Sequence, residues 1–444
     1  MARYDLAVLA DESKFNGFHA KILAWCLFVL ICDGYDLAVV GATLPVIMDD
    51  MDIEATSAGV MAGSALFGTM MGAIFLGTLS DRIGRRRMMA ICVALFSLFT
   101  AGAGLTSDPI AFSAMRFVAG LGIGGVLPIA TAQMSEFAPL RLRTRLVTLV
   151  FAGYSVGGIL VALTAKYLIE EYGWQSVFFV AGLPVVAIPF ILRSMPESIA
   201  YMISQGRQED LASVACRLAP DIDFAGAEFT NAADTASGAS VSQLFEKGRA
   251  WGTVMIWVGF ITGLFMVYAL NSWLTKLMAM AGHSLGSALD FVIMFNIGSI
   301  VGAALGGFLG DKFNIKRVLV GFYLTGAASL TLLAYSEGKS LLFLVVFLVG
   351  ATTLGTQLLA YAFAGNYYPA EIRATGVGFA SGMGRIGAIA APVLIGWLIS
   401  LNLPLEQNFM AISVAGLIGA AAIALIGNSH AASGNLAERQ GEAA

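Results

Sequence analysis

Residues 77–87 read Gly-Thr-Leu-Ser-Asp-Arg-Ile-Gly-Arg-Arg-Arg, and a related stretch, Gly-Phe-Leu-Gly-Asp-Lys-Phe-Asn-Ile-Lys-Arg, occupies residues 307–317. The same offset of 230 residues aligns further glycine, proline and arginine positions: Gly120 with Gly350, Gly125 with Gly355, Pro139 with Pro369, Arg143 with Arg373 and Gly157 with Gly387. Chance rarely keeps one register through so many turn-forming and charged positions. The sequence therefore predicts two related halves arranged as a parallel repeat.

The composition predicts that both halves lie in a membrane. Hydrophobic residues make up 58% of the 444 residues and charged residues only 12%, about half the charged share of ordinary soluble proteins. A bilayer-spanning helix takes about 20 apolar residues. The sequence contains twelve such runs, and it predicts an all-α membrane protein with twelve transmembrane helices in two six-helix bundles. The runs are 20–46, 57–79, 88–106, 109–134, 146–168, 174–193, 251–277, 287–309, 316–335, 340–363, 374–400 and 406–427.

The predicted organisation places an N-terminal bundle at 1–195, a cytoplasmic linker at 196–250, a C-terminal bundle at 251–430 and a cytoplasmic tail at 431–444. Most of the 25 lysine and arginine residues fall on one side of the membrane if the N-terminus is cytoplasmic. Basic residues favour the cytoplasmic side, so both termini are expected there. Residues 1–20 lack the pattern of a cleaved signal peptide, and the first helix is expected to direct its own insertion.

Several classes of function are not expected. The net charge of −4 and the absence of a basic patch outside the loops argue against a nucleic-acid partner. The four cysteines show no spacing typical of zinc or of a disulfide framework. The predicted helices also carry no nucleophile–base set and no metal cluster, so neither an enzyme, a metal nor a cofactor is expected.

The repeated loop predicts a gate. A glycine lets two helix ends approach closely, an aspartate can face a neighbouring helix N-terminus, and arginines can hold nearby carboxylates. Alternatively, the arginines of the first loop only mark the cytoplasmic side. For Glu136, Arg143, Glu371 and Arg373, the alternative is contact with substrate. The predicted gating residues are Gly77, Asp81, Arg82, Arg85, Arg86, Glu136, Arg143, Asp311, Glu371 and Arg373.

Two carboxylates, Asp33 and Asp36, lie in the middle of the first predicted helix and share one of its faces. An ionised group at that depth is costly unless it is paired or hydrated, which makes it a functional candidate. We expect this pair to couple transport to protons. The alternative is that one aspartate neutralises an arginine as a permanent scaffold.

Two arginines lie inside predicted helices. Arg116 opens a glycine-rich segment at a depth comparable to that of Asp36, so it is expected to partner a proton-coupling carboxylate, to anchor substrate or to form a fixed ion pair. Arg385 lies near mid-membrane, where a guanidinium can grip a carboxylate through two hydrogen bonds or tether two helices.

Polar and aromatic residues of the second half are further candidates for contact with substrate. For the aromatic residues, the alternative is that they face lipid or the core. These candidates are Asn271, Trp273, Asn296 and Tyr361.

Three elements together resemble the aromatic acid:proton symporters of the major facilitator superfamily: Asp-Gly-Tyr-Asp at 33–36, the complete loop at 77–87 and the glycine segment after Arg116. The segment 268–278, Tyr-Ala-Leu-Asn-Ser-Trp-Leu-Thr-Lys-Leu-Met, is most similar to the bacterial benzoate transporters. The resemblance implies that Asp33 and Asp36 are essential for transport and that Arg385 is a functional charge. The second loop departs from the family motif at residues 314–315.

The resemblance implies proton-coupled uptake of an aromatic carboxylate, benzoate or a close relative, across a bacterial inner membrane by alternating access. Residues 153–158 lack the Gly-Pro signature of drug antiporters, which favours uptake over efflux. The implied partners are the aromatic acid anion, protons and the lipid bilayer, and the protein is expected to be a monomer. Two alternatives stay open: a symporter for another organic anion, such as a hydroxybenzoate, muconate or an aliphatic acid, and a ligand sensor built on a transporter fold.

Overall fold

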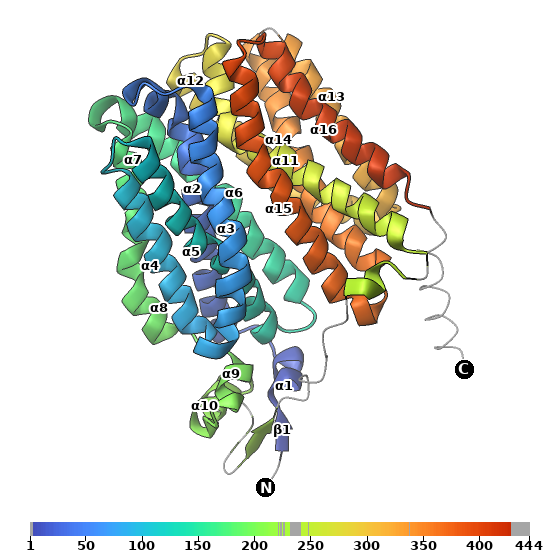
Figure 1. The fold of residues 1–444 in the computed structure, drawn as a ribbon. Helices are drawn as coiled ribbons and strands as arrows, with labels where there is room; N and C mark the ends of the chain where they lie inside the picture. Colours follow the sequence, from blue (N-terminus) through green and yellow to red (C-terminus); the bar gives the residue numbers. More distant parts are fainter. Residues whose placement is uncertain are drawn as a thin grey trace. The chain divides into compact units, whose positions relative to one another are not determined.

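The computed structural model describes residues 3–220, 222, 224, 227–230, 241–246, 248–336 and 338–427, and the predicted tail at 431–444 lies outside the described residues. Within these residues, twelve helical spans are long and apolar enough to cross a bilayer (Figure 1). The predicted all-helical membrane fold is confirmed, and each predicted run falls within a few residues of an observed helix.

The first six spans are α2 (Gly17–Asp50), α3 (Ala55–Ile83), α4 (Arg85–Ala103), α5 (Pro109–Phe137), α6 (Arg143–Tyr172) and a broken sixth span. The sixth consists of α7 (Gln175–Gly182), the 3-10 turn η1 (Leu183–Ala187) and α8 (Ile188–Ser194). The remaining six are α11 (Ala250–Met280), α12 (Leu285–Lys312), α13 (Ile315–Tyr335), α14 (Lys339–Tyr367), α15 (Ala370–Ser400) and α16 (Leu405–Ala424).

The chain forms two compact units. Unit 1 comprises Met1–Val40 and Ser64–Ala236, and unit 2 comprises Gly41–Gly63 and Ser237–Ala444. The hairpin between α2 and α3 therefore belongs to unit 2, where it packs against α11 and α15. A Cβ on Gly41 would overlap the carbonyl of Asn271, and one on Gly59 would lie 2.5 Å from the carbonyl of Pro392.

The internal repeat reappears as equivalent helix contacts in the two units. In unit 1, a Cβ on Gly72 would overlap the carbonyl oxygen of Leu121. In unit 2, a Cβ on Gly302 would overlap that of Ala351, at positions 230 residues later. Three more pairs of contacts keep the same offset: Gly68–Phe117 with Gly298–Phe347, Gly120–Ala65 with Gly350–Phe295, and Gly157–Ile31 with Gly387–Ile261. Glycine allows this close backbone approach between membrane helices, so the shared glycines set the same packing in both units.

A small subdomain forms part of unit 1 near the N-terminus (Figure 1). The strand β1 (Arg3–Asp5) pairs in parallel with β2 (Glu228–Thr230) from the linker. The ring of Tyr4 packs edge-on against Phe224, with ring centroids 5.1 Å apart. The short helices α1 (Leu6–Glu12), α9 (Ile199–Ser204) and α10 (Gln208–Leu218) complete it. The linker region thus carries ordered structure that joins the N-terminal residues to the helices of unit 1.

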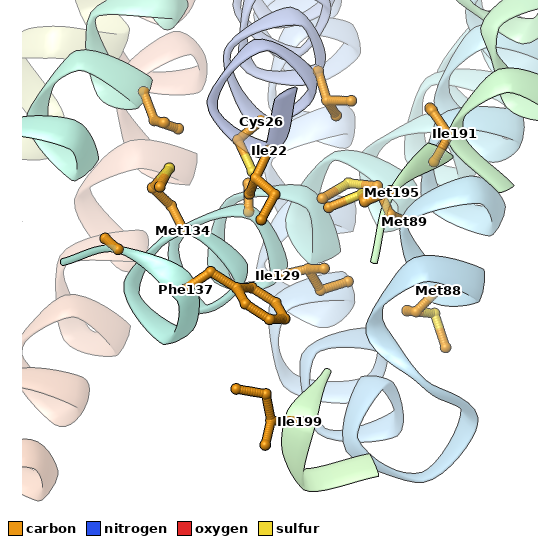
Figure 2. Close-up of a cluster of buried hydrophobic side chains, with 14 of the residues drawn as sticks. Ile22, Cys26, Met88, Met89, Ile129, Met134, Phe137, Ile191, Met195 and Ile199 are labelled. Atoms are coloured by element: carbon orange, nitrogen blue, oxygen red, sulfur yellow. The ribbon is translucent and has the colours of Figure 1, made fainter. Parts of the chain in front are cut away.

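An apolar cluster connects this subdomain to the membrane helices (Figure 2). It continues into the buried side chains of α1 and α10, including Leu6 and Leu211. Burial of this continuous apolar surface stabilises the subdomain on unit 1. The labelled side chains are Ile22, Cys26, Met88, Met89, Ile129, Met134, Phe137, Ile191, Met195 and Ile199.

Candidate functional site

A fully buried ion pair lies inside unit 1. Arg116 of α5 donates from Nη1 to Oδ1 of Asp36 on α2, and both residues are 0% exposed. Nη2 of Arg116 also donates to the backbone carbonyl of Asp36, at 3.0 Å. Of the two pairings that the sequence left open, Arg116 with Asp33 or with Asp36, the structure shows the second.

Thr100 of α4 bridges this pair. Its hydroxyl accepts a hydrogen bond from Nη1 of Arg116 at 2.5 Å and donates to Oδ2 of Asp36 at 2.6 Å. Thr100 is itself fully buried. Three helices therefore converge on one carboxylate, and hydrogen bonds to a charged group are the stronger kind. Both carboxylate oxygens of Asp36 are occupied in this arrangement.

Asp33 lies one turn earlier on α2 and is only 3% exposed. Between the two aspartates, the hydroxyl of Tyr35 lies 2.8 Å from that of Thr164 and donates to the carbonyl of Val177 at 3.0 Å. Both carboxylates thus lie inside the helix bundle of unit 1. A low-dielectric setting of this kind makes proton binding and ion pairing at a carboxylate strongly interdependent.

The predicted gating residues of the first loop form a connected charge cluster. Arg85, at the start of α4, donates to Oε2 of Glu136 near the end of α5. The other oxygen of Glu136 accepts from the backbone N–H groups of Ile199 at 2.8 Å and Ala200 at 3.3 Å. Glu136 thus ties the first turn of α9 to α4, so one carboxylate joins three segments of unit 1.

Glu197 provides the second centre of this cluster. Its Oε1 accepts from the backbone N–H of Arg86 at 3.0 Å, and its carboxyl group fills the space beside Gly84. Gly84 has a φ of +98°, a conformation that side chains disfavour. A carboxylate at a helix N-terminus is favourable because it meets unpaired N–H groups and the positive end of the helix dipole.

The other predicted residues of the first loop are placed as follows. The side chain of Asp81 is 73% exposed and lies 3.9 Å from Arg85, one turn along. Arg82 is exposed. Gly77 lies beside Pro128, and a Cβ built on Gly77 would be 3.6 Å from the Cγ of Pro128. Arg143 donates to Asp11 of α1, so its observed partner is the N-terminal subdomain, and Glu136 pairs with Arg85.

The matching loop of unit 2 has a different character. Asp311 is exposed, and Nε of Arg373 donates to the carbonyl of Tyr368 at 3.5 Å. Burial raises the pKa of Tyr368 to about 12. The side chain of Glu371 lies outside the described part of the chain. Asn314 caps α13 by accepting from the N–H groups of residues 316 and 317, at 3.1 and 3.3 Å.

Two of the predicted substrate contacts lie on facing helices of unit 2. The hydroxyl of Tyr361 on α14 lies 2.7 Å from that of Ser381 on α15, and its ring packs edge-on against Phe260 on α11, with centroids 5.0 Å apart. Arg385 lies one turn beyond Ser381 on α15 and is partly exposed. An aromatic pair, two hydroxyls and a guanidinium are therefore grouped on three neighbouring helices.

Three further residues predicted to contact substrate, all in unit 2, have contacts within the protein. Trp273 is fully buried, and its indole N–H donates to the carbonyl of Pro392 at 2.9 Å. Asn296 is 3% exposed and donates back to the carbonyl of Val292 on its own helix at 2.9 Å. Asn271 is half-buried, and its backbone carbonyl is in close contact with Gly41. Their role in binding stays a prediction.

Sequence reasoning missed Thr100, Glu197 and Asp11. No short-range pattern marks Thr100, because its partners lie 64 and 16 residues away. The only indication for Glu197 in the sequence is its place as a single charged residue between Pro196 and Ser198, just after the sixth span. Asp11 lies 132 residues from its partner Arg143, so no local pattern predicts this ion pair.

The twelve membrane-spanning helices, built from two halves with equivalent helix contacts, define a membrane transporter of the major facilitator type. Comparison with known proteins agrees: the Major Facilitator Superfamily profile matches residues 26–305 and 283–444. The chain belongs to this superfamily, and the prediction of a transporter rather than an enzyme is confirmed.

Individual relatives narrow this assignment. The chain is 37% identical to the benzoate transport protein of Acinetobacter baylyi, over 94% of this chain and 91% of that protein. It is 32% identical to the gallate transporter of Pseudomonas putida, over 97% and 96%. The resemblance to bacterial transporters of this kind is confirmed. Among solved structures, a D-xylose-proton symporter superposes with a TM-score of 0.68 at 18% identity, covering 92% of this chain and 97% of that one, which establishes a shared fold alone.

Proposed function

We propose that this protein takes up an aromatic carboxylate, benzoate or a close relative, together with protons by alternating access. The observation that carries the proposal is the fully buried group of Asp36, Arg116 and Thr100 in a chain whose relatives transport benzoate and gallate. Ionisable groups inside membrane helices are expensive to maintain and mark ion or proton pathways.

The proposed roles divide between the two units. Asp33 and Asp36 bind the transported proton, and Arg116 balances the charge of Asp36. Because Arg116 is fully buried whereas Arg385 is partly exposed, Arg385 is the better candidate for the substrate carboxylate. The rings of Tyr361 and Phe260 offer an aromatic surface to the substrate ring.

A protonation cycle follows from these roles. Protonation of the Asp36 carboxyl group weakens its ion pair with Arg116 and loosens the contact between α2 and α5. Proton release restores the pair. The cluster of Arg85, Glu136 and Glu197 stabilises one conformation through its helix-capping bonds, which have to break when these helices move apart.

We also propose the setting in which the protein works. The distribution of basic residues supports a multi-pass protein of the bacterial inner membrane with both termini in the cytoplasm. The protein is proposed to act as a monomer, with the aromatic anion, protons and lipid as its partners and with no nucleic acid.

The test is uptake of radiolabelled benzoate and a panel of aromatic acids by proteoliposomes under an imposed pH gradient. Uptake is expected only when the outside is more acidic, and a protonophore should abolish it. Asp36→Asn, measured beside the wild type, should bind substrate without accumulating it. Accumulation that survives the protonophore would refute proton coupling, and absence of uptake across the whole panel would refute the substrate class.

A further inference from the structure

Gln357 on α14 has a buried amide without a hydrogen-bond partner. The residue is 5% exposed, and neither its Nε2 nor its Oε1 has a partner among the residues that the structure describes. Buried amides are nearly always hydrogen-bonded, because an unpaired polar group in an apolar setting is unfavourable. An unpaired amide inside a membrane-spanning helix therefore points to a partner that is bound for only part of the transport cycle.

The amide lies directly against Gly263 of α11, where only a glycine leaves room for it. A Cβ built on Gly263 of α11 would lie 3.0 Å from Oε1 of Gln357 and 2.9 Å from the hydroxyl of Tyr323. The Tyr323 hydroxyl already donates to the carbonyl of Gly259 at 2.6 Å, whereas the amide has no such bond. The repeat aligns Gly263 with Asp33. The amide therefore lies beside the position in unit 2 that corresponds to a buried carboxylate in unit 1.

The amide also lies at the depth of the predicted substrate contacts. The helices α14 and α15 are antiparallel neighbours, and the hydroxyls of Tyr361 and Ser381 join them. Gln357 precedes Tyr361 by four residues, and Arg385 follows Ser381 by four. Because the two helices run in opposite directions, Gln357 and Arg385 both lie one helical turn from the Tyr361–Ser381 contact on the same side of it. Their side chains are therefore at the same level on neighbouring helices.

We propose that Gln357 recognises a ring hydroxyl on the substrate. This inference rests on the proposed function and deepens it, because it names the substrate class as hydroxylated aromatic acids. Arg385 would hold the carboxylate, the rings of Phe260 and Tyr361 would contact the aromatic ring, and the amide would bind the hydroxyl. A hydroxyl both donates and accepts hydrogen bonds, so it can satisfy either atom of the amide.

Benzoate fits this group less well. It has one polar substituent, the carboxylate, and it would leave the Gln357 amide unpaired in the complex. A site that hydrogen-bonds a substrate hydroxyl strongly rejects the analogue that lacks it, because the polar group of the site then remains buried and unsatisfied. The structure therefore favours a hydroxybenzoate over benzoate.

The test compares dissociation constants of the purified full-length protein for benzoate and for 2-, 3- and 4-hydroxybenzoate. The wild type should bind at least one hydroxybenzoate about tenfold more tightly than benzoate. Gln357→Met keeps the length of the side chain and removes the amide, so it should abolish this preference while changing benzoate binding by less than about threefold.

Two further variants provide a second test and a folding control. Gly263→Ala is the second test: it places a methyl group against the amide from another helix and should also reduce the preference. Ser413→Ala removes a buried hydroxyl that donates to Ala327 on the α13–α16 interface at 2.8 Å, and it should leave the preference intact.

Equal binding of benzoate and all three hydroxybenzoates by the wild type would overturn the inference. A preference that survives Gln357→Met would also overturn it. Either result leaves aromatic acid transport standing. Failure of the folded wild type to bind any of the four acids would instead refute the proposed function itself.

Discussion

The two six-helix halves of this protein pack alike but carry different chemistry. Glycines at the same offset of 230 residues bring equivalent helices into backbone contact in both. The buried charges are not repeated. Asp36, Thr100 and Arg116 in the first half correspond to Met266, Leu330 and Val346 in the second, all of which are apolar.

The polar group of the second half is not repeated in the first half either. Gln357, Tyr361 and Arg385 correspond to Leu127, Thr131 and Ser155, which carry no amide, aromatic ring or charge. The comparison shows that the backbone contacts which shape the helix bundle are independent of the ionisable groups that it carries. A duplicated scaffold can therefore carry a buried ion pair in one half and a different polar group in the other.

The largest effect is expected from importing one residue of the second half into the ion pair of the first. Arg116→Val leaves the Asp36 carboxylate buried without its partner and should cost about 3–5 kcal/mol in the free energy of unfolding. Adding Asp36→Met should recover much of that loss, because unit 1 then has the apolar residues of unit 2, while uptake stays abolished. Unfolding in detergent and proteoliposome uptake measure both. If Arg116→Val alone is as stable as the wild type, the ion pair does not contribute to stability.

Thr100→Val sharpens the same comparison with less disturbance. It removes the hydroxyl that bridges Asp36 and Arg116 and should cost about 1.5–3 kcal/mol in unfolding free energy. Because the ionised carboxylate loses a donor, the pH profile of uptake should also move toward higher pH. Thr100→Ser retains the hydroxyl and is expected to keep the wild-type profile. If the valine and serine variants have the same pH profile, the bridge has no part in coupling.

The shared scaffold predicts matching effects in the two halves. Gly157→Ala and Gly387→Ala each place a Cβ against a backbone carbonyl, at Ile31 and Ile261, and should destabilise by about 1–3 kcal/mol each. Gly382→Ala on the same helix as Gly387 meets no atom within 4 Å and should be neutral or slightly stabilising. Thermal unfolding of the three variants is the measurement. A large difference between the first two would show that the halves do not share one packing scheme.

The smallest effect concerns the N-terminal subdomain, which has no counterpart among the described residues of unit 2. Asp11→Asn breaks a half-exposed ion pair with Arg143 and should change stability by about 0–1 kcal/mol. The difference from wild type should shrink further at high salt, because salt screens exposed charges. A loss of stability that is large and independent of salt would mean that Asp11 stabilises the subdomain through its packing and hydrogen bonds rather than through its charge.

Most of the architecture was predictable because it depends on local or periodic patterns. A run of about 20 apolar residues can satisfy its backbone in lipid only as a helix. The repeat of Gly77 and Asp81 at Gly307 and Asp311 predicted two halves without any knowledge of contacts. The depth of Asp33 and Asp36 within their helix followed directly from their position in the first run.

The partners of these charges depended on the tertiary structure. The sequence could not choose between Asp33 and Asp36 as the partner of Arg116, because both aspartates lie on one face of a helix. It gave no indication that Thr100 would complete the pair or that Glu197 would meet Gly84. Such contacts depend on how helices distant in sequence rotate and pack, whereas helix formation in the membrane depends only on the chain's own polarity.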